Sequence, residues 1–240
     1  MLSLPEAREK VIVALDVDRA CALELAGELS GHARWVKVGM TLFFAEGPEI
    51  VDEMHARGLK VFLDLKVHDI PFQVKGAVRS ASLTGADMVS IHGLGGAEMV
   101  AAAREGAEEA ATLRGGRRTK IVAISILTSM DQEALSSVGV EASVADEVAR
   151  LAALSYGAGA DGIVCSPQEA AEMRSLLGQD ALIVCPGVRP AGADVGDQRR
   201  VATPSAAVAA GASMLVVGRP ITEAEDPLGA FDAICAELVG

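Results

Sequence analysis

The chain has 240 residues, half of them hydrophobic but only 3% aromatic, and its formal net charge is −12. This length fits one large α/β domain or two small ones, and about 250 residues is the usual size of a (β/α)8 barrel. The negative charge argues against a general affinity for nucleic acid or for anionic membranes, because both require a basic surface.

Eight short apolar runs rich in β-branched residues recur along the chain and predict eight strands. Their nearly continuous hydrophobicity indicates burial on both faces, which is typical of a parallel sheet covered by helices. The predicted strands are residues 11–16, 35–39, 61–66, 88–92, 121–127, 162–165, 181–185 and 214–218.

The segments between these runs have helical periodicity. Val144, Val148, Leu151 and Leu154 are spaced for one helical face, and Pro167 is expected to open a helix just after the sixth strand. Eight strand–helix units without a linker favour a closed (β/α)8 TIM barrel of eight parallel strands over a doubly wound sheet. We therefore expect residues 1–240 to form a single α/β domain of this class.

Charged residues stand at the ends of the first three predicted strands. Asp16 ends the first strand, Lys37 lies near the end of the second, and Asp64 and Lys66 end the third, with Asp69 shortly after them. Barrel chemistry occurs at the carboxyl ends of the strands, so these groups are expected to meet at the barrel mouth. The alternative is a buried ion-pair network without function, which would be energetically poor compared with apolar packing.

These charges belong to motifs that resemble a known enzyme family. The string DLKVHDIP at residues 64–71 is similar to the characteristic motif of the orotidine 5′-monophosphate decarboxylases. Further matches occur in the same order: ALD ending at Asp16, VKVG around Lys37, and the segments at residues 127–130 (LTSM), 186–190 (PGVRP), 196–204 (GDQRRVATP) and 217–222 (VGRPIT). The resemblance covers the chain from the first to the eighth predicted strand.

The resemblance implies that the chain converts orotidine monophosphate to uridine monophosphate and carbon dioxide, without a metal or another cofactor. Lys66 would stabilise the carbanion at C6 of the pyrimidine and then protonate it. Asp64 would lie beside the departing carboxylate, and Asp69 would flank the lysine from a second subunit. Lys37 and Asp16 would bind the ribose hydroxyls and complete the charge network.

The same resemblance assigns the remaining substrate contacts. Thr128 and Ser129 would bind the pyrimidine edge, and Pro186 would lie against its pocket. The phosphate ligands would be Gly218, Arg219, Gln198 and, as a weaker assignment, Arg189, with residues 189–204 forming a lid. His92, at the end of the fourth predicted strand, could assist at the ribose but is more simply a structural histidine.

The family resemblance also implies a homodimer in which Asp69 and Ile70 cross the interface. One departure is that Phe72-Gln73 follows DIP, where many relatives have Asn-Thr, so the hydroxyl contact from the partner is expected to be missing or replaced by Gln73. Two other functions stay open: a magnesium-dependent sugar-phosphate lyase or decarboxylase of the same superfamily, and a non-catalytic nucleotide-binding barrel.

Two further features concern location in the cell. The N-terminal residues lack the basic-then-apolar pattern of a secretory signal, and the four cysteines are scattered, which is typical of reduced thiols in a cytoplasmic protein. The longest stretch without charge, residues 201–218, contains Pro204 and Gly211 and therefore predicts a loop, a helix and a strand rather than a membrane span.

Overall fold

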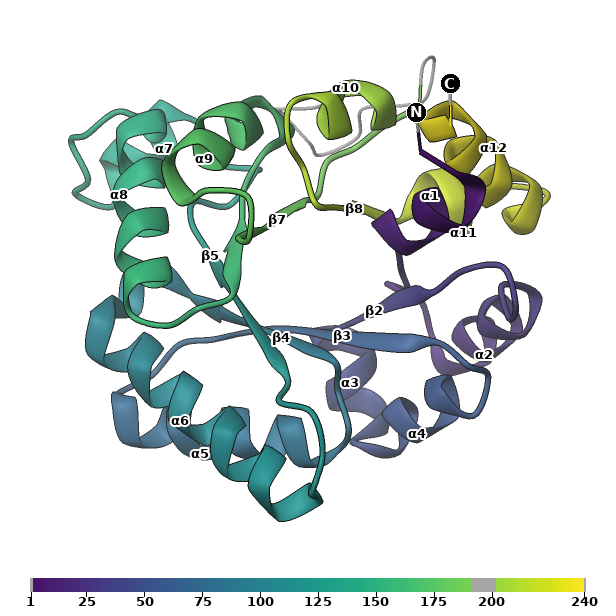
Figure 1. The fold of residues 1–240 in the computed structure, drawn as a ribbon, viewed down its shortest axis with the longest axis horizontal. Coiled ribbons are helices and arrows are strands. Elements are labelled where there is room, and N and C mark those ends of the chain that lie inside the picture. Colours follow the sequence, from purple (N-terminus) through teal and green to yellow (C-terminus); the bar gives the residue numbers. More distant parts are fainter. Residues whose placement is uncertain (1, 191–201, 240) are drawn as a thin grey trace.

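The computed structural model describes residues 2–190 and 202–239. Eight parallel strands close into a barrel in the order β1 to β8, with β8 pairing back to β1. The helices surround this barrel, and the helices that begin and end the chain lie side by side next to β8 (Figure 1). The predicted (β/α)8 barrel is therefore confirmed.

The strands coincide closely with the apolar runs of the sequence. They are β1 Val11–Ala14, β2 Trp35–Gly39, β3 Lys60–Val67, β4 Met88–His92, β5 Lys120–Ile124, β6 Gly162–Val164, β7 Leu182–Cys185 and β8 Met214–Val217. The fifth strand ends earlier than the sequence predicts, because the backbone leaves the sheet after Ile124 and enters the loop above the barrel.

Helices connect successive strands, and several of the helices have N-caps that the sequence itself supplies. The α-helices are α1 Leu4–Lys10, α2 Arg19–Glu28, α3 Met40–Glu46, α4 Glu49–His55, α5 Pro71–Leu83, α6 Gly96–Arg114, α7 Gln132–Ser137, α8 Val144–Gly157, α9 Ala170–Leu177, α10 Pro204–Ala209, α11 Arg219–Thr222 and α12 Pro227–Val239, with 3-10 turns η1 Gly93–Gly95 and η2 Pro167–Glu169. The periodic segment starting at Val144 is α8, which Ser143 caps through its side chain.

Pro167 opens a 3-10 turn, and the α-helix begins only at Ala170. The helical opening predicted at Pro167 is therefore the 3-10 turn, and the α-helix itself begins three residues later. Ser166 and Glu169 form a capping box across this turn, which stabilises the tighter geometry before the helix starts.

The apolar side chains form two separate clusters. The larger one lies between the strands and the surrounding helices, and the smaller one fills the barrel. The barrel interior contains Ile12, Ala14, Trp35, Phe62, Met88, Val122, Ile124, Val164, Val184, Met214 and Val216. Because side chains alternate along a strand, the next residues point outwards to the helices. The filled interior separates the two ends of the barrel, so each end can carry a site of its own.

No helix among the described residues is long and apolar enough to span a membrane.

Candidate active site

A cavity of 460 Å³ opens at the carboxyl ends of the strands. Its floor is the upper layer of the barrel interior, where Ala14, Phe62, Ile124, Val164 and Val216 are buried. Its polar wall contains Asp16, Lys37, Asp64, Lys66, Thr128, Arg189 and Arg219. The cavity therefore combines an apolar floor with charged walls, as is usual for sites that bind small molecules.

Four of the predicted charges form a continuous chain of ion pairs along this wall. The Lys37 ammonium lies 2.7 Å from Asp16 Oδ1 and 3.6 Å from Asp64 Oδ2. The Lys66 ammonium in turn lies 2.8 Å from Asp64 Oδ2. The charges thus alternate in sign along this row of ion pairs, so each ammonium group contacts a carboxylate.

Asp64 is the central group of this chain and is largely buried, with 13% of its side chain exposed. Burial raises the pKa of its carboxyl, but the nearby charges of Lys37 and Lys66 and hydrogen bonds from Lys66 and Ser90 outweigh that effect. The pKa of Asp64 therefore lies below its ordinary value, and the carboxylate stays ionised at neutral pH. It provides a fixed negative charge against which both ammonium groups are held.

Lys66 adopts an unusual backbone conformation. Its φ of 50° is the one positive value at a non-glycine position among the described residues, and the pairing of β3 with β4 shifts register between Leu63 and Val67. The Lys66 backbone N–H donates to Ser90 Oγ at 2.9 Å, in place of a regular bond between strands. Holding a non-glycine residue in this left-handed region costs about 1–3 kcal/mol of conformational free energy, and such conformations concentrate at functional sites.

Ser90 was not predicted from the sequence, although it contacts two of the charged residues of the site. Its hydroxyl donates to Asp64 Oδ1 at 2.8 Å and accepts the Lys66 N–H, and the side chain is fully buried. Ser90 therefore fixes both members of the Asp64–Lys66 pair. A signal was present, because Ser90 is a polar residue in an apolar strand, two positions after the inward-facing Met88.

Gly39 is required by the close approach of two charged side chains. A Cβ atom at this position would lie 2.8 Å from Asp16 Oδ1 and 3.2 Å from Lys37 Nζ. A larger residue would therefore displace the Asp16–Lys37 pair, which explains why a glycine ends β2.

The other predicted contacts divide into three groups. Thr128, Pro186, Arg189, Gly218 and Arg219 line the cavity with the four charged residues. Asp69 and Ile70 do not line it: Asp69 is exposed, its Oδ1 accepts the Ile70 N–H at 2.7 Å, and Ile70 is 63% exposed. Gln198 lies outside the described residues, as does most of the predicted lid.

Ser129 is exposed and His92 is half-buried, and neither lines the cavity. The His92 ring stacks on that of His68 with centroids 5.2 Å apart. Burial, together with the charges of His68 and Lys66, lowers the pKa of His92. The structure therefore places His92 against His68, just after the end of β3, and not among the residues that line the cavity.

Three of the four predicted phosphate ligands, Arg189, Gly218 and Arg219, lie on the β7 and β8 side of the cavity. Gly218 precedes the short helix α11, which begins at Arg219, and Gly187 and Arg189 follow β7. Thr222 and Glu223 also line this side, although the sequence did not single them out. Among residues 2–190 and 202–239, no group of three His, Cys, Asp or Glu side chains is arranged to hold a metal ion.

Comparison with known proteins gives a consistent result. The family described as "Orotidine 5'-phosphate decarboxylase / HUMPS family" matches residues 9–234. Curated proteins named orotidine 5'-phosphate decarboxylase are similar to this chain. The protein of Halorhodospira halophila is 50% identical, over 95% of this chain and 95% of its own length. The protein of Synechococcus sp. is 46% identical, over 100% of both chains. The crystal structure of orotidine 5'-phosphate decarboxylase from Lactobacillus acidophilus superposes with a TM-score of 0.85 at 36% identity, covering 97% of this chain and 100% of that one.

Proposed function

Because the chain belongs to the orotidine 5'-phosphate decarboxylase / HUMPS family, we propose that it decarboxylates orotidine 5'-monophosphate to uridine 5'-monophosphate. The observation that supports this reaction most strongly is the Lys66 ammonium, held 2.8 Å from a buried carboxylate at the wall of the cavity. We further propose that residues 1–240 act as one domain, since all eight strands contribute to a single barrel.

The difficulty of the reaction is the charge left on C6 of the pyrimidine. When the bond from C6 to the carboxylate breaks, carbon dioxide leaves and its electron pair stays on C6, where no adjacent carbonyl group can delocalise it. A fixed ammonium beside C6 stabilises this carbanion more than it stabilises the starting substrate, and therefore lowers the barrier. We assign this role to Lys66, whose Nζ proton then passes to C6.

Asp64 and Lys37 position the ammonium of Lys66. Asp64 holds it through the 2.8 Å contact, and Lys37 holds Asp64 from the other side at 3.6 Å. Since these partners are already in place before substrate binds, little reorganisation is needed as the carbanion forms. We assign Lys37 and Asp16 to the ribose hydroxyls, because they lie farther along the same wall.

The remaining lining residues fit the other parts of the nucleotide. Thr128 can hydrogen-bond the pyrimidine edge, and Pro186 can pack against its face. Arg219 can bind the phosphate with two parallel hydrogen bonds, with Gly218 and Arg189 beside it. Closure of residues 189–204 over the phosphate, with Gln198 as a ligand, is part of this proposal and rests on the family resemblance.

We propose that the active enzyme is a homodimer that shares its sites. Asp69 follows Lys66 by three residues but does not line the cavity of its own subunit. The neighbouring Ile70 and Phe72 are 63% and 81% exposed, and Met40, Phe44 and Leu94, which follow the adjacent strands β2 and β4, are exposed as well. A second copy that covers this apolar rim would bury these side chains and bring its Asp69 towards Lys66.

The direct test follows the loss of orotidine monophosphate absorbance with and without a metal chelator. We expect turnover that the chelator does not change. Absence of turnover would contradict the proposal and leave the non-catalytic nucleotide-binding barrel. Turnover that the chelator abolishes would instead favour the magnesium-dependent enzymes of the same superfamily.

A mixing experiment tests the shared site. Inactive Lys66→Ala and Asp69→Ala proteins are combined under conditions in which subunits exchange. One site of each heterodimer then has both wild-type residues, so a statistical mixture should recover up to about a quarter of wild-type activity. No recovery despite verified exchange would show that Asp69 acts within its own subunit.

A further inference from the structure

A second cavity, of 370 Å³, lies at the end of the barrel opposite the proposed active site. It is lined by Trp35, Lys60 and Lys120, which are the first residues of β2, β3 and β5, and by Asp87, which precedes β4. Arg114, at the end of α6, and residues 117–119, in the loop before β5, line it as well. None of these residues lines the mouth cavity, so the two cavities are separate.

The lining is strongly cationic, although the chain as a whole has a net charge of −12. Asp87 is its one carboxylate, and it is already engaged by the His55 ring at 3.2 Å and by the Val61 N–H at 3.0 Å. The five cations of the lining are Lys60, Arg114, Arg117, Arg118 and Lys120.

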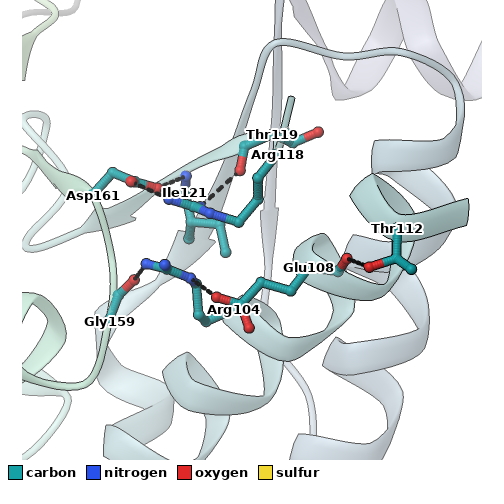
Figure 2. Close-up of polar contacts among 8 residues, drawn as sticks. All are labelled: Arg104, Glu108, Thr112, Arg118, Thr119, Ile121, Gly159 and Asp161. Carbon is teal, nitrogen blue, oxygen red and sulfur yellow. Dashed lines mark hydrogen bonds and ion pairs between the residues drawn. The ribbon is translucent and has the colours of Figure 1, made fainter. Parts of the chain in front are cut away.

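Two of the five cations, Arg118 and Lys60, form ion pairs with carboxylates that do not line the cavity. Arg118 makes a two-bonded ion pair with Asp161, whose carboxylate also accepts the Ile121 N–H (Figure 2). Lys60 lies 5.1 Å from the centre of the Trp35 ring and 3.6 Å from Glu9 Oε2. These contacts fix the inner wall of the cavity.

The other three cations of the lining are exposed to solvent and lack a carboxylate partner among the described residues. They are Arg114, Arg117 and Lys120. Arg114 donates to the Ser82 carbonyl at 3.3 Å, which anchors one side of its guanidinium next to Gly85. Three cations around one concave surface repel each other, and an anion bound between them would remove this repulsion.

We propose that this cavity binds a short oligophosphate anion, either inorganic pyrophosphate or the phosphate chain of a nucleoside diphosphate or triphosphate. Arginine guanidinium groups bind phosphate oxygens with paired hydrogen bonds, and lysine adds a further positive charge. The volume suits a small molecule, and three cations without a carboxylate partner match a multiply charged anion better than a single phosphate. This inference does not depend on the proposed decarboxylation.

Trp35 provides a direct measurement, because it is the only tryptophan of the chain and it lines this cavity. Pyrophosphate is titrated into the protein at constant ionic strength while tryptophan emission is followed. We expect a saturable change at millimolar concentrations or below, accompanied by a rise in Tm. Inorganic phosphate should bind much more weakly, and a nucleoside triphosphate should bind at least as tightly as pyrophosphate.

Variants locate the binding. The double substitution Arg117→Gln/Lys120→Gln removes two charge-assisted contacts and should weaken pyrophosphate binding by about tenfold or more. Both residues are exposed, so the fold should persist. Arg79→Gln removes an exposed cation outside the cavity and should leave binding unchanged, and Arg219→Ala at the barrel mouth should leave the Trp35 signal intact.

Several results would overturn the proposal. One is a lack of saturable signal in both emission and Tm. Another is equal binding of phosphate, pyrophosphate and an uncharged nucleoside. A third is loss of the signal in Arg219→Ala with no loss in Arg117→Gln/Lys120→Gln, which would assign the anion to the mouth.

Discussion

The two ends of this barrel carry similar numbers of charged residues but arrange them in different ways. At the mouth, Lys37 and Asp64 are mostly buried, with 9% and 13% of their side chains exposed. Each of the four charged residues in the row of ion pairs contacts one of opposite sign. At the base, Arg117 and Lys120 are exposed and have no ion pair among the described residues. A buried charge must have a partner because desolvation is costly, whereas water can solvate an exposed one. Burial therefore requires Lys37 and Asp64 to be paired, and such fixed charges are what electrostatic catalysis requires.

The largest effect should follow from removing the proposed proton donor at the mouth. Lys66→Ala should lower kcat by at least the ~10²–10⁴-fold typical of a lost general acid, while nucleotide binding largely survives. Kinetics and binding of uridine monophosphate measure the two effects separately. Near-normal turnover would remove Lys66 from the mechanism, and an unchanged Tm would show that the loss is chemical.

Arg219→Ala should have the next largest effect, and it should depend on the substrate's phosphate. Loss of charge-assisted hydrogen bonds should reduce kcat/KM for orotidine monophosphate by about 10–100-fold. Turnover of orotidine, which lacks the phosphate, should barely change. Equal losses for both substrates would place Arg219 outside the phosphate site.

At the base, removing a fixed charge should affect stability and leave activity unchanged. Arg118→Ala breaks the pair with Asp161, in which 21% and 20% of the side chains are exposed, and leaves that carboxylate half-buried without its main partner. The free energy of unfolding should fall by about 1.5–3 kcal/mol. Urea denaturation measures it, and kcat/KM serves as the control. A loss of activity equal to that of Arg219→Ala would show that the two ends are coupled.

The smallest effect concerns pH and the buried carboxylate of the mouth. Because the pKa of Asp64 in the folded protein lies below its ordinary value of 3.8, its contribution to stability is complete above that pH. The contribution is lost as the pH falls through the lowered pKa. Asp64→Asn should therefore reduce stability more near neutral pH than at a pH below 3.8. The exposed Asp180→Asn is a control, and an equal effect of Asp64→Asn at both pH values would contradict the assignment.

The sequence predicted the barrel well because strands in a parallel sheet are encoded locally. A run such as residues 214–217 is apolar throughout, as is typical of a parallel strand covered by helices. The boundaries were less accurate. The run at residues 121–127 stays apolar beyond the strand's end, because Ile126 and Leu127 line the cavity above the sheet. Apolar character alone does not distinguish a strand from a buried loop.

The site was predicted in part. The positions of Asp16, Lys37, Asp64 and Lys66 at strand ends placed them at the mouth, and the structure brings all four together. The sequence missed Ser90, because its importance comes from the register between β3 and β4. That register brings its hydroxyl to both Asp64 and the Lys66 N–H.

By itself, the sequence determined the eight strand–helix units, the rim position of the charged residues and the resemblance to a decarboxylase family. These features depend on local periodicity and on residue order, which a linear chain contains. Only the tertiary structure decided which charges pair, how deeply each is buried, and that a cationic cavity forms at the far end of the barrel. Those properties depend on distances between strands remote in sequence, which are fixed only when the barrel closes and its interior is packed.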